Sequence, residues 1–139
     1  MSEEGSGSGG AADYNEFLRV SGLQVEEVDG DGVRGWIDLD ERHHTPWGVV
    51  HGGVYATAVE SAASLGASAA VKEREQFAVG LHNSTDFLRP VTEGRVEVVA
   101  QPIMQGKSQQ LWQVIITRAE DGKPVARGQV RLQNVPLPS

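Results

Sequence analysis

The sequence predicts an α+β protein in which one long helix is wrapped by a curved antiparallel β-sheet. A run of mostly small and apolar residues extends from Trp47 to Val71, and its one charged residue is Glu60. Two strand-like runs precede this segment and four follow it. A helix without a polar face of its own is buried, so we expect the sheet to cover most of it. A second copy of the chain should cover the rest.

Before the long helix, the sequence predicts a short helix and a β-hairpin. The short helix is expected over residues 13–22, because Asp13 can cap its start and Gly22 can end it. Its apolar side would carry Tyr14, Phe17, Leu18 and Val20. The runs 23–29 and 33–40 are separated by Gly-Asp-Gly, which is typical of a hairpin turn.

The second half of the chain is expected to form the long helix and four strands. The helix should begin at Gly52 and end near Val71. The strands should occupy residues 77–90, 94–106, 108–120 and 125–134, with the last three paired as an antiparallel meander. Residues 1–12 are rich in Gly and Ser and should form a flexible tail, which leaves residues 13–139 as a single domain.

Composition argues against several classes of function. The net charge of −7 disfavours a nucleic-acid binder and requires local cations for any anionic ligand. Without cysteine the chain has no thiolate nucleophile and no disulfide. The first residues lack the basic start and apolar core of a signal peptide, so a cytoplasmic protein is expected. A helix of Gly, Ala and Ser with a central Glu60 is a poor membrane span. No metal is expected, because ligand spacing is absent around the histidines, which are His43, His44, His51 and His82.

Three motifs resemble those of a known family. The first motif is WGVVHGG, which has an acid, Glu60, nine residues after its histidine. The second is FLRPV with a following EG, and the third is QGKSQQLWQV. Together they resemble the hotdog-fold acyl-CoA thioesterases of the phenylacetate-pathway and 4-hydroxybenzoyl-CoA group. The resemblance extends from about Leu23 to Asn134, and the combination is more specific than HGG alone. It implies a hotdog fold and hydrolysis of an acyl-CoA, whose acyl group would be aryl or of medium length.

The resemblance also implies the catalytic residues. Glu60 would act as nucleophile or general base toward the thioester carbonyl. The backbone N–H of Gly52 would polarise the carbonyl oxygen, with His51 beside it. Ser64 stands where the family often has a hydroxyl that assists the acid. No separate cofactor is implied, because coenzyme A is part of the substrate.

The substrate-binding residues include one departure from the family pattern. Thr45 stands six residues before the HGG histidine, where the family commonly has Gln or Asn, so either His44 replaces that amide or turnover is slower. Arg89 and Lys107 are the best candidates to bind the CoA phosphates. Gly80 lies inside a strand, where a ligand could approach the backbone closely. The full set expected to contact the acyl group or CoA is Thr45, Gly53, Gly80, Phe87, Leu88, Arg89, Pro90, Gly106, Lys107, Ser108 and Gln109.

Helix geometry gives an independent argument for an oligomer. Free N–H groups at a helix start suit a developing oxyanion, and glycine lets a ligand approach the backbone. Gly52 and Glu60 are eight residues apart, roughly 12 Å along a helix, so they cannot both touch one carbonyl carbon. If both are catalytic, the site is shared between two chains. The family resemblance implies the same arrangement, a homodimer with shared active sites that associates as a dimer of dimers.

Other readings of the same residues stay open. The glycine pair could be an ordinary, tightly packed helix start, and Glu60 could reach the surface at a subunit edge. Thr57 and Ser64 lie on the same helix face as Glu60, although packing alone explains Thr57. At the level of function, the alternatives are a hydratase or dehydratase of the same fold and a non-catalytic acyl-CoA binder or sensor.

Overall fold

The computed structural model describes residues 15–138. The flexible tail predicted for residues 1–12 lies outside this range, as do Asp13 and Tyr14. The elements follow in the order α1 (Glu16–Ser21), β1 (Gln24–Asp29), β2 (Gly32–Leu39), η2 (Glu41–His43), α2 (Gly52–Ala70), η3 (Lys72–Arg74), β3 (Gln76–Phe87), β4 (Gly94–Gln105), β5 (Gln109–Arg118) and β6 (Pro124–Pro136).

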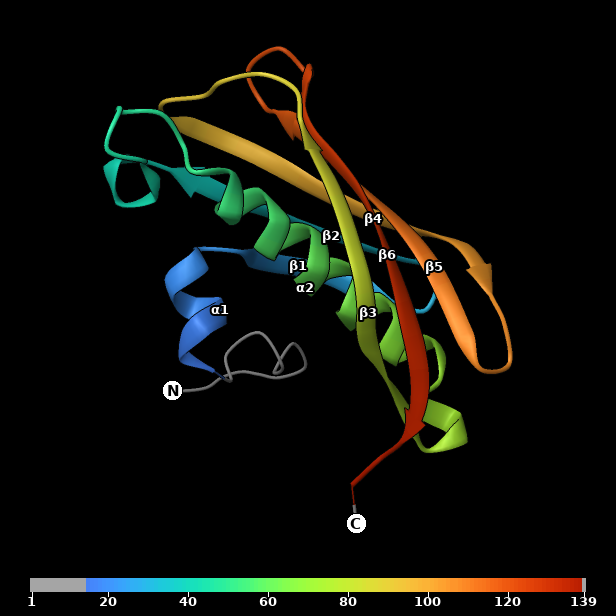
Figure 1. Cartoon of the computed structure of the whole chain (residues 1–139). Coiled ribbons are helices and arrows are strands. Elements are labelled where there is room, and N and C mark those ends of the chain that lie inside the picture. Colours follow the sequence, from blue (N-terminus) through green and yellow to red (C-terminus); the bar gives the residue numbers. More distant parts are fainter. Residues whose placement is uncertain (1–14, 139) are drawn as a thin grey trace.

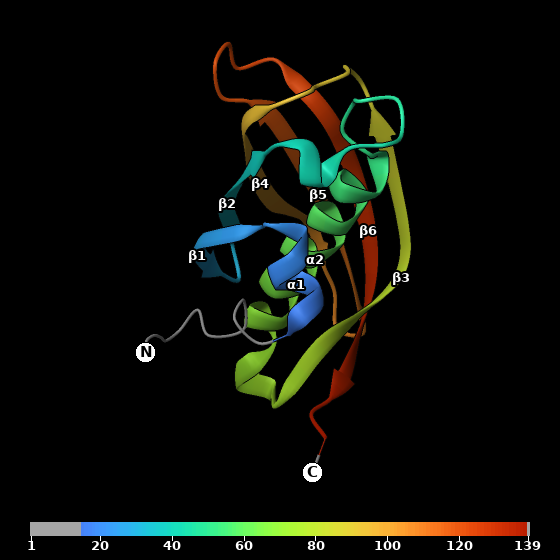
Figure 2. The same cartoon turned by 90° about the vertical axis from the view of Figure 1, so that its left-hand side faces the viewer.

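The six strands form one antiparallel sheet in the order β1-β2-β4-β5-β6-β3. The sheet curves around α2, which lies along its concave side (Figures 1 and 2). β1 and β2 form the predicted hairpin, and β4, β5 and β6 form the predicted meander. The α+β arrangement of one long helix wrapped by a curved antiparallel sheet is therefore confirmed.

One face of α2 is buried against the sheet and consists mostly of small side chains. Its buried residues are Tyr55, Ala58, Val59, Ala62, Ala63, Gly66 and Ala67. The indole of Trp112 packs against the helix backbone at Gly66, where an added Cβ would lie 2.5 Å from the ring. Small residues thus allow the helix and the sheet to approach closely. Among the described residues, no helix is long and apolar enough to cross a membrane.

The opposite face of α2 is only partly covered within one chain. Within a single chain its residues are half-buried, and they include Ala56, Thr57, Glu60, Ser61 and Ser64. Within one chain the sheet covers one side of α2 and leaves this second face partly exposed, as expected for a helix that the sheet alone does not cover completely. Phe17 of α1 lies beside this second face. The expectation that a second copy covers the rest stays a prediction.

α1 is shorter than predicted and its apolar residues are less buried. It begins at Glu16, where the side chain of Asn15 accepts a hydrogen bond from the Leu18 N–H (2.9 Å). Gly22 ends it with a φ of 85°, in the left-handed region that glycine favours. Leu18 packs against the core, but Phe17 is 69% exposed and Val20 is 66% exposed. The predicted apolar side is therefore wrong for these last two residues, because α1 covers the edge of α2 rather than entering the core.

A buried polar network fixes the far end of α2. The amide nitrogen of Gln110 donates to the carbonyl of Ala67 (2.9 Å) and to Asn134 Oδ1 (2.8 Å). Its amide oxygen accepts from the indole N–H of Trp112 (2.8 Å). Asn134 in turn donates to the carbonyl of Lys107 (3.1 Å). Because buried polar groups are costly without partners, this network holds the β4–β5 turn firmly against the C-terminal end of α2.

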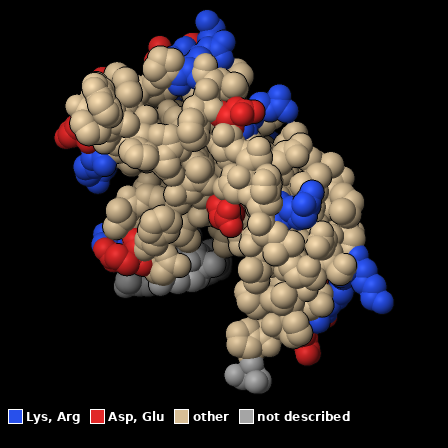
Figure 3. Space-filling view, in the orientation of Figure 1, with Lys and Arg blue, Asp and Glu red and all other residues tan. Residues whose placement is uncertain are grey.

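β3 lies at one end of the sheet, so one of its edges has no neighbouring strand among the described residues. It is 12 residues long, and its outward side chains include Val79 (41% exposed) and Leu81 (53% exposed). The space-filling view in the same orientation as Figure 1 shows large areas of uncharged residues between the charged side chains (Figure 3). Long, exposed strand edges readily pair with another chain, which agrees with the expected dimer.

Candidate active site

Glu60 lies in the middle of α2, where a chain of hydrogen bonds orients its carboxylate. Glu60 Oε1 accepts from Asn83 Nδ2 on β3 (3.1 Å), and the same nitrogen donates to the carbonyl of Ala56 (3.1 Å). Asn83 Oδ1 accepts from the hydroxyl of Thr85 (2.6 Å). A hydrogen bond to a carboxylate is stronger than one between neutral groups, so Asn83 holds Glu60 in one orientation.

Sequence reasoning missed Asn83. In a regular strand alternate residues face the same side, which from Ala78 and Gly80 would place His82 against the helix. The pairing of β3 with β6 is instead irregular between Gly80 and His82, and the extra residue turns Asn83 toward α2. The detectable signal was Gly80 itself, because a glycine inside a strand often marks such a bulge.

Gly80 makes room for the catalytic candidate rather than for a ligand. A Cβ at this position would collide with Oε2 of Glu60, so the carboxylate lies directly against the bare backbone of β3. Gly80 was predicted to allow a ligand close to the backbone; here Glu60 occupies that space. Gly80 therefore contributes to the site by leaving space for the Glu60 carboxylate.

Gly80→Ala should displace the Glu60 carboxylate and lower kcat by at least about tenfold, because misplacement of a catalytic group by an ångström is costly. Gly32→Ala on β2 is a matched control, since its Cβ would meet the nearest atom, the carbonyl oxygen of Ala100, at an ordinary 3.4 Å. Steady-state kinetics and thermal midpoints of both variants are the measurement. Activity of Gly80→Ala within about twofold of wild type would show that catalysis does not depend on holding the Glu60 carboxylate in this position.

Glu60 opens into a surface hollow of about 260 Å³ between α2, α1 and β3. Its lining residues are Phe17, Ala56, Thr57, Glu60, Ser61 and Asn83. Ser64, predicted to assist the acid, is half-buried and does not line this hollow. The hydroxyls that share it with Glu60 belong to Thr57 and Ser61.

The start of α2 presents a backbone donor, the N–H of Gly52, that no acceptor within residues 15–138 engages. The Nδ1 atom of His51 accepts the N–H of Gly53 (2.8 Å), and the carbonyl of His51 accepts the N–H of Val54 (3.0 Å). Gly52 is thus the available donor, whereas the N–H of Gly53, predicted to contact the substrate, is already used.

A second hollow, of about 210 Å³, lies beside this donor. It is lined by Val50, Gly52, Tyr55, Phe87, Leu88, Arg89 and Pro90. The structure therefore brings the predicted segment 87–90 to the predicted donor. The ring of Phe87 covers Gly52 so closely that a Cβ there would collide with it. Arg89 is exposed at the rim, where Nη1 donates to the carbonyl of Pro124 (2.7 Å).

Thr45 and His44 maintain the loop that leads to α2. The Thr45 hydroxyl accepts from the N–H of Trp47 (3.2 Å), and the Thr45 N–H donates to the carbonyl of Val49 (2.7 Å). His44 Nε2 lies 2.7 Å from the carbonyl oxygen of Thr92. Both side chains therefore have local partners, and the suggestion that His44 replaces the family's amide gains no support from this geometry.

The predicted segment 106–109 lies at the other end of α2. Its backbone is held there by Arg74, whose Nη1 donates to the carbonyl of Lys107 (3.4 Å), and by Asn134. α2 has 19 residues, roughly 28 Å of helix, and this length separates Lys107 from the hollow beside Arg89. Within one chain the predicted residues thus form three groups along α2: around Gly52, around Glu60, and in the turn of Gly106, Lys107, Ser108 and Gln109.

Comparison with known proteins identifies the family. A family model described as the thioesterase superfamily matches residues 48–125, more than half of the chain. The chain belongs to the thioesterase superfamily. The matched segment contains Gly52, Glu60 and Asn83.

Relatives of the thioesterase agree with this membership. Rv1847 of Mycobacterium tuberculosis, named as a candidate esterase, is 45% identical over 116 residues, which are 82% of each chain. The solved structure of that protein has a TM-score of 0.85 at 42% identity, covering 90% of this chain and 100% of the other. The thioesterase HI1161 of Haemophilus influenzae has a TM-score of 0.84 at 29% identity, covering 93% and 89% of the two chains. A 1,4-dihydroxy-2-naphthoyl-CoA hydrolase of Listeria monocytogenes is 32% identical over 96 residues, 69% of this chain and 77% of its own.

Family membership confirms three expectations from the sequence. The resemblance to the thioesterases, the hotdog fold and the general class of thioester hydrolase all agree with the matched family and the solved structures. Among the described residues of the thioesterase, no group of three or more His, Cys, Asp or Glu side chains could hold a metal ion. The buried His43 instead accepts the backbone N–H of Asp40 with Nδ1 (3.1 Å).

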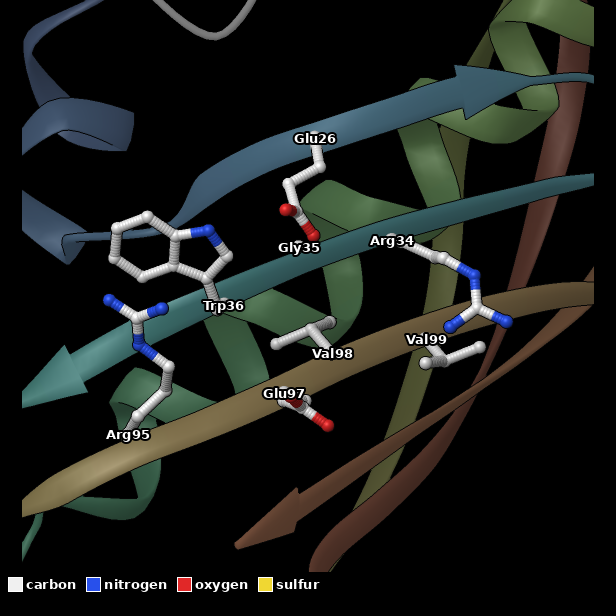
Figure 4. A pocket seen from close by; sticks show the side chains of 8 residues that line it. All are labelled: Glu26, Arg34, Gly35, Trp36, Arg95, Glu97, Val98 and Val99. Atoms are coloured by element: carbon white, nitrogen blue, oxygen red, sulfur yellow. The ribbon is translucent and has the colours of Figure 1, made fainter. Parts of the chain in front are cut away.

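A further groove of the thioesterase lies on the outer face of β1, β2 and β4, across the sheet from α2 (Figure 4). Its two arginines have acidic partners nearby. Arg95 stacks 3.8 Å from the Trp36 ring centroid and donates to Asp38 (2.7 Å), and Arg34 lies 3.9 Å from Glu27. This groove therefore contributes nothing to the chemistry around Glu60.

Proposed function

We propose that the thioesterase hydrolyses an aryl-CoA, with Glu60 as nucleophile or general base and the Gly52 N–H as the donor to the thioester oxygen. The observation that supports this proposal is the way in which the Glu60 carboxylate is held in place. A carboxylate on a helix of small residues is oriented by Asn83, placed against the bare backbone of Gly80 and opened to a surface hollow.

The chemistry follows from these two groups. Attack on the thioester carbon moves negative charge onto the carbonyl oxygen, and a fixed N–H donor stabilises that charge. As a general base, Glu60 takes a proton from water, and the resulting hydroxide forms the new C–O bond while CoA leaves as its thiolate. As a nucleophile, the Glu60 carboxylate attacks the carbonyl carbon and expels CoA as its thiolate, which gives a mixed anhydride. Water then opens the anhydride, releases the acid and restores the Glu60 carboxylate.

We propose that each site combines two chains. The eight residues between Gly52 and Glu60 span roughly 12 Å, and the two residues line different hollows. Pairing the free edge of β3 with that of a second copy would set two α2 helices antiparallel, each Gly52 near the partner's Glu60. In the same arrangement, the C-terminal end of the partner's α2 would extend beyond Gly52 of the first chain. The partner's Lys107 would then lie on the side of Gly52 where Arg89 stands. The cations separated in one chain would then serve one CoA.

The aryl preference rests on the hollow beside Gly52. Its walls are apolar, with Phe87 packed over the donor glycine and Leu88 next to it. Flat aromatic groups pack well against such rings. The Listeria relative is named for a naphthoyl-CoA substrate, which supports an aryl acyl group here. Because CoA thioesters are intracellular metabolites, this substrate also supports the cytoplasmic location predicted from the sequence.

Arg89→Ala and Lys107→Ala should each raise KM for acyl-CoA by about tenfold, as expected for the loss of a charged hydrogen bond. The same variants should change KM for pantetheine thioesters of the same acyl group by less than about twofold, since pantetheine lacks the nucleotide phosphates. Arg34→Ala, on the outer face, is the matched control. An equal rise for both kinds of substrate would mean that these residues shape the fold or the acyl pocket.

Release of free CoA thiol from benzoyl-, phenylacetyl- and medium-chain acyl-CoAs tests the proposed function directly. We expect turnover with aryl substrates and at most weak turnover with the others. A non-catalytic binder is the second candidate, favoured by Thr45, whose hydroxyl is engaged in its own loop where the family has an amide. Binding of acyl-CoA without thiol release from any substrate would support that candidate instead.

A further inference from the structure

Phe17 is the large apolar side chain of the hollow into which Glu60 opens. The other described residues that line this hollow are small or polar, namely Ala56, Thr57, Ser61 and Asn83 besides Glu60 itself. Within one chain Phe17 is nevertheless 69% exposed. An apolar ring gains free energy when it leaves water, so a phenylalanine left open beside Glu60 is suited to cover an apolar group that binds there.

The short helix α1, which carries Phe17, is anchored to the rest of the chain. The side chain of Asn15 accepts from the N–H of Leu18 (2.9 Å), and the hydroxyl of Ser21 donates to the carbonyl of Leu18 (2.7 Å). The side chain of Leu18 packs against the hydrophobic core. α1 is thereby held beside α2 (Figure 2), which keeps Phe17 at the hollow of Glu60.

The proposed reaction brings the acyl group to this hollow. As a nucleophile, Glu60 must come within about 3.5 Å of the thioester carbon. As a general base, it is separated from that carbon by one water molecule. In an aryl thioester such as benzoyl-CoA the ring is bonded directly to this carbon, so the ring lies in the hollow beside Glu60. The hollow measures about 260 Å³, and an apolar cavity of about 150 Å³ is enough for benzene.

We infer that Phe17 determines acyl specificity, because its ring packs against the aromatic ring of the substrate while Glu60 acts on the adjoining carbonyl. The inference rests on the proposed function and adds a residue to its acyl pocket. In a site shared by two chains, Phe87 comes from the chain that supplies Gly52, and Phe17 from the chain that supplies Glu60. Two aromatic rings attract each other more than their buried area alone accounts for, so Phe17 favours aryl over straight-chain acyl groups.

A second copy of the chain is the other group that could cover Phe17, because exposed apolar side chains often mark contacts between proteins. Val20 separates the two explanations. It follows Phe17 by three residues, so it lies on the same side of α1, and it is 66% exposed. It does not line the hollow of Glu60. A contact between copies on this side of α1 would bury both side chains, whereas the acyl group would meet Phe17 alone.

The test compares Phe17→Ala with wild type on benzoyl-CoA and hexanoyl-CoA, by release of CoA thiol. The ratio of kcat/KM for benzoyl-CoA to that for hexanoyl-CoA should fall about fivefold, because the contact between two aromatic rings is lost. Phe17→Tyr keeps the ring and should retain the wild-type ratio within about twofold. Val20→Ala is the matched control and should retain it too. An unchanged ratio in Phe17→Ala, or an equal fall for both substrates, would overturn the inference.

Two further measurements separate this role from the alternatives. Phe17→Ala and Val20→Ala should match wild type in thermal midpoint and oligomer size, because both side chains are largely exposed. A smaller assembly of Phe17→Ala would show that a second copy covers the ring, and would overturn the inference.

Dissociation constants of benzoyl-CoA and hexanoyl-CoA are also measured in the Glu60→Gln background, with and without Phe17→Ala. Binding of benzoyl-CoA should weaken at least about threefold more than binding of hexanoyl-CoA, as expected for the loss of a ring contact. This selective weakening is expected even if wild type hydrolyses neither substrate. Absence of hydrolysis therefore contradicts the proposed function, while equal weakening for both ligands contradicts the role of Phe17.

Discussion

Replacing Glu60 with glutamine is expected to lower kcat by at least about 100-fold while the protein stays folded. Glutamine keeps the shape of the side chain, and its Oε1 can still accept from Asn83 Nδ2 as Glu60 does at 3.1 Å. What it loses is the negative charge, and with it the ability to accept a proton from water or to attack the thioester. The measurement is thiol release under saturating substrate, together with the thermal midpoint.

Glu97→Gln is the matched control, because this glutamate lies on the outer face of β4 within the groove of Figure 4. It should retain wild-type activity. Turnover of Glu60→Gln within about threefold of wild type would identify Glu60 as a packing residue. Single-turnover hydrolysis in isotope-labelled water then tests the nucleophilic role in wild type, since label entering the Glu60 side chain requires the mixed anhydride.

Two inactive variants should restore each other's activity if the site is shared between chains. Glu60→Ala removes the acid, and Gly52→Pro removes the donor N–H. Gly52 is the first residue of α2, a position where proline is well tolerated. Random pairing of equal amounts makes about half of the dimers mixed, and each mixed dimer contains one intact site of two. About a quarter of wild-type activity should therefore return from a nearly inactive mixture.

Gly52→Ala is the control for the proline variant. Either substitution adds a Cβ that must displace the Phe87 ring, but alanine keeps the N–H. Higher activity for Gly52→Ala than for Gly52→Pro isolates the contribution of the donor. Both variants must match wild type in circular dichroism and oligomer size, and subunits must exchange before assay. No recovery under these conditions would place the whole site within one chain.

Much of the fold could be predicted because its signals are local. The central helix stands out by its small residues, and β2 shows a clear alternation of buried and exposed positions. The extent of burial could not be predicted, since it depends on how far the sheet reaches around α2. The start of α1 was placed too early because Asp13 and Asn15 are equally good caps by residue type, and the structure uses Asn15.

The candidate site likewise contains residues that could be predicted from the sequence and residues that could not. Gly52 and Glu60 could be found from residue type and spacing along one helix. Asn83 could not, because the irregularity in β3 changes which residues face α2. Helical spacing favoured Ser64 as the neighbour of Glu60, but Phe17 of α1 bounds the hollow on the side of Ser61. The position of α1 is a tertiary property that helix periodicity does not contain.

The network around Gln110 has a consequence for motion. Gln110 and Asn134 tie the turn that carries Lys107 to the end of α2, and the N–H of Asn134 also donates to the carbonyl of Ser108 (2.8 Å). A turn fixed in this way has little conformational entropy left to lose when a ligand arrives. It should behave as part of the rigid body of the helix rather than as a closing flap, and its backbone amides should exchange slowly with solvent deuterium. At this end of the molecule, affinity would then come from a surface already shaped before the ligand binds.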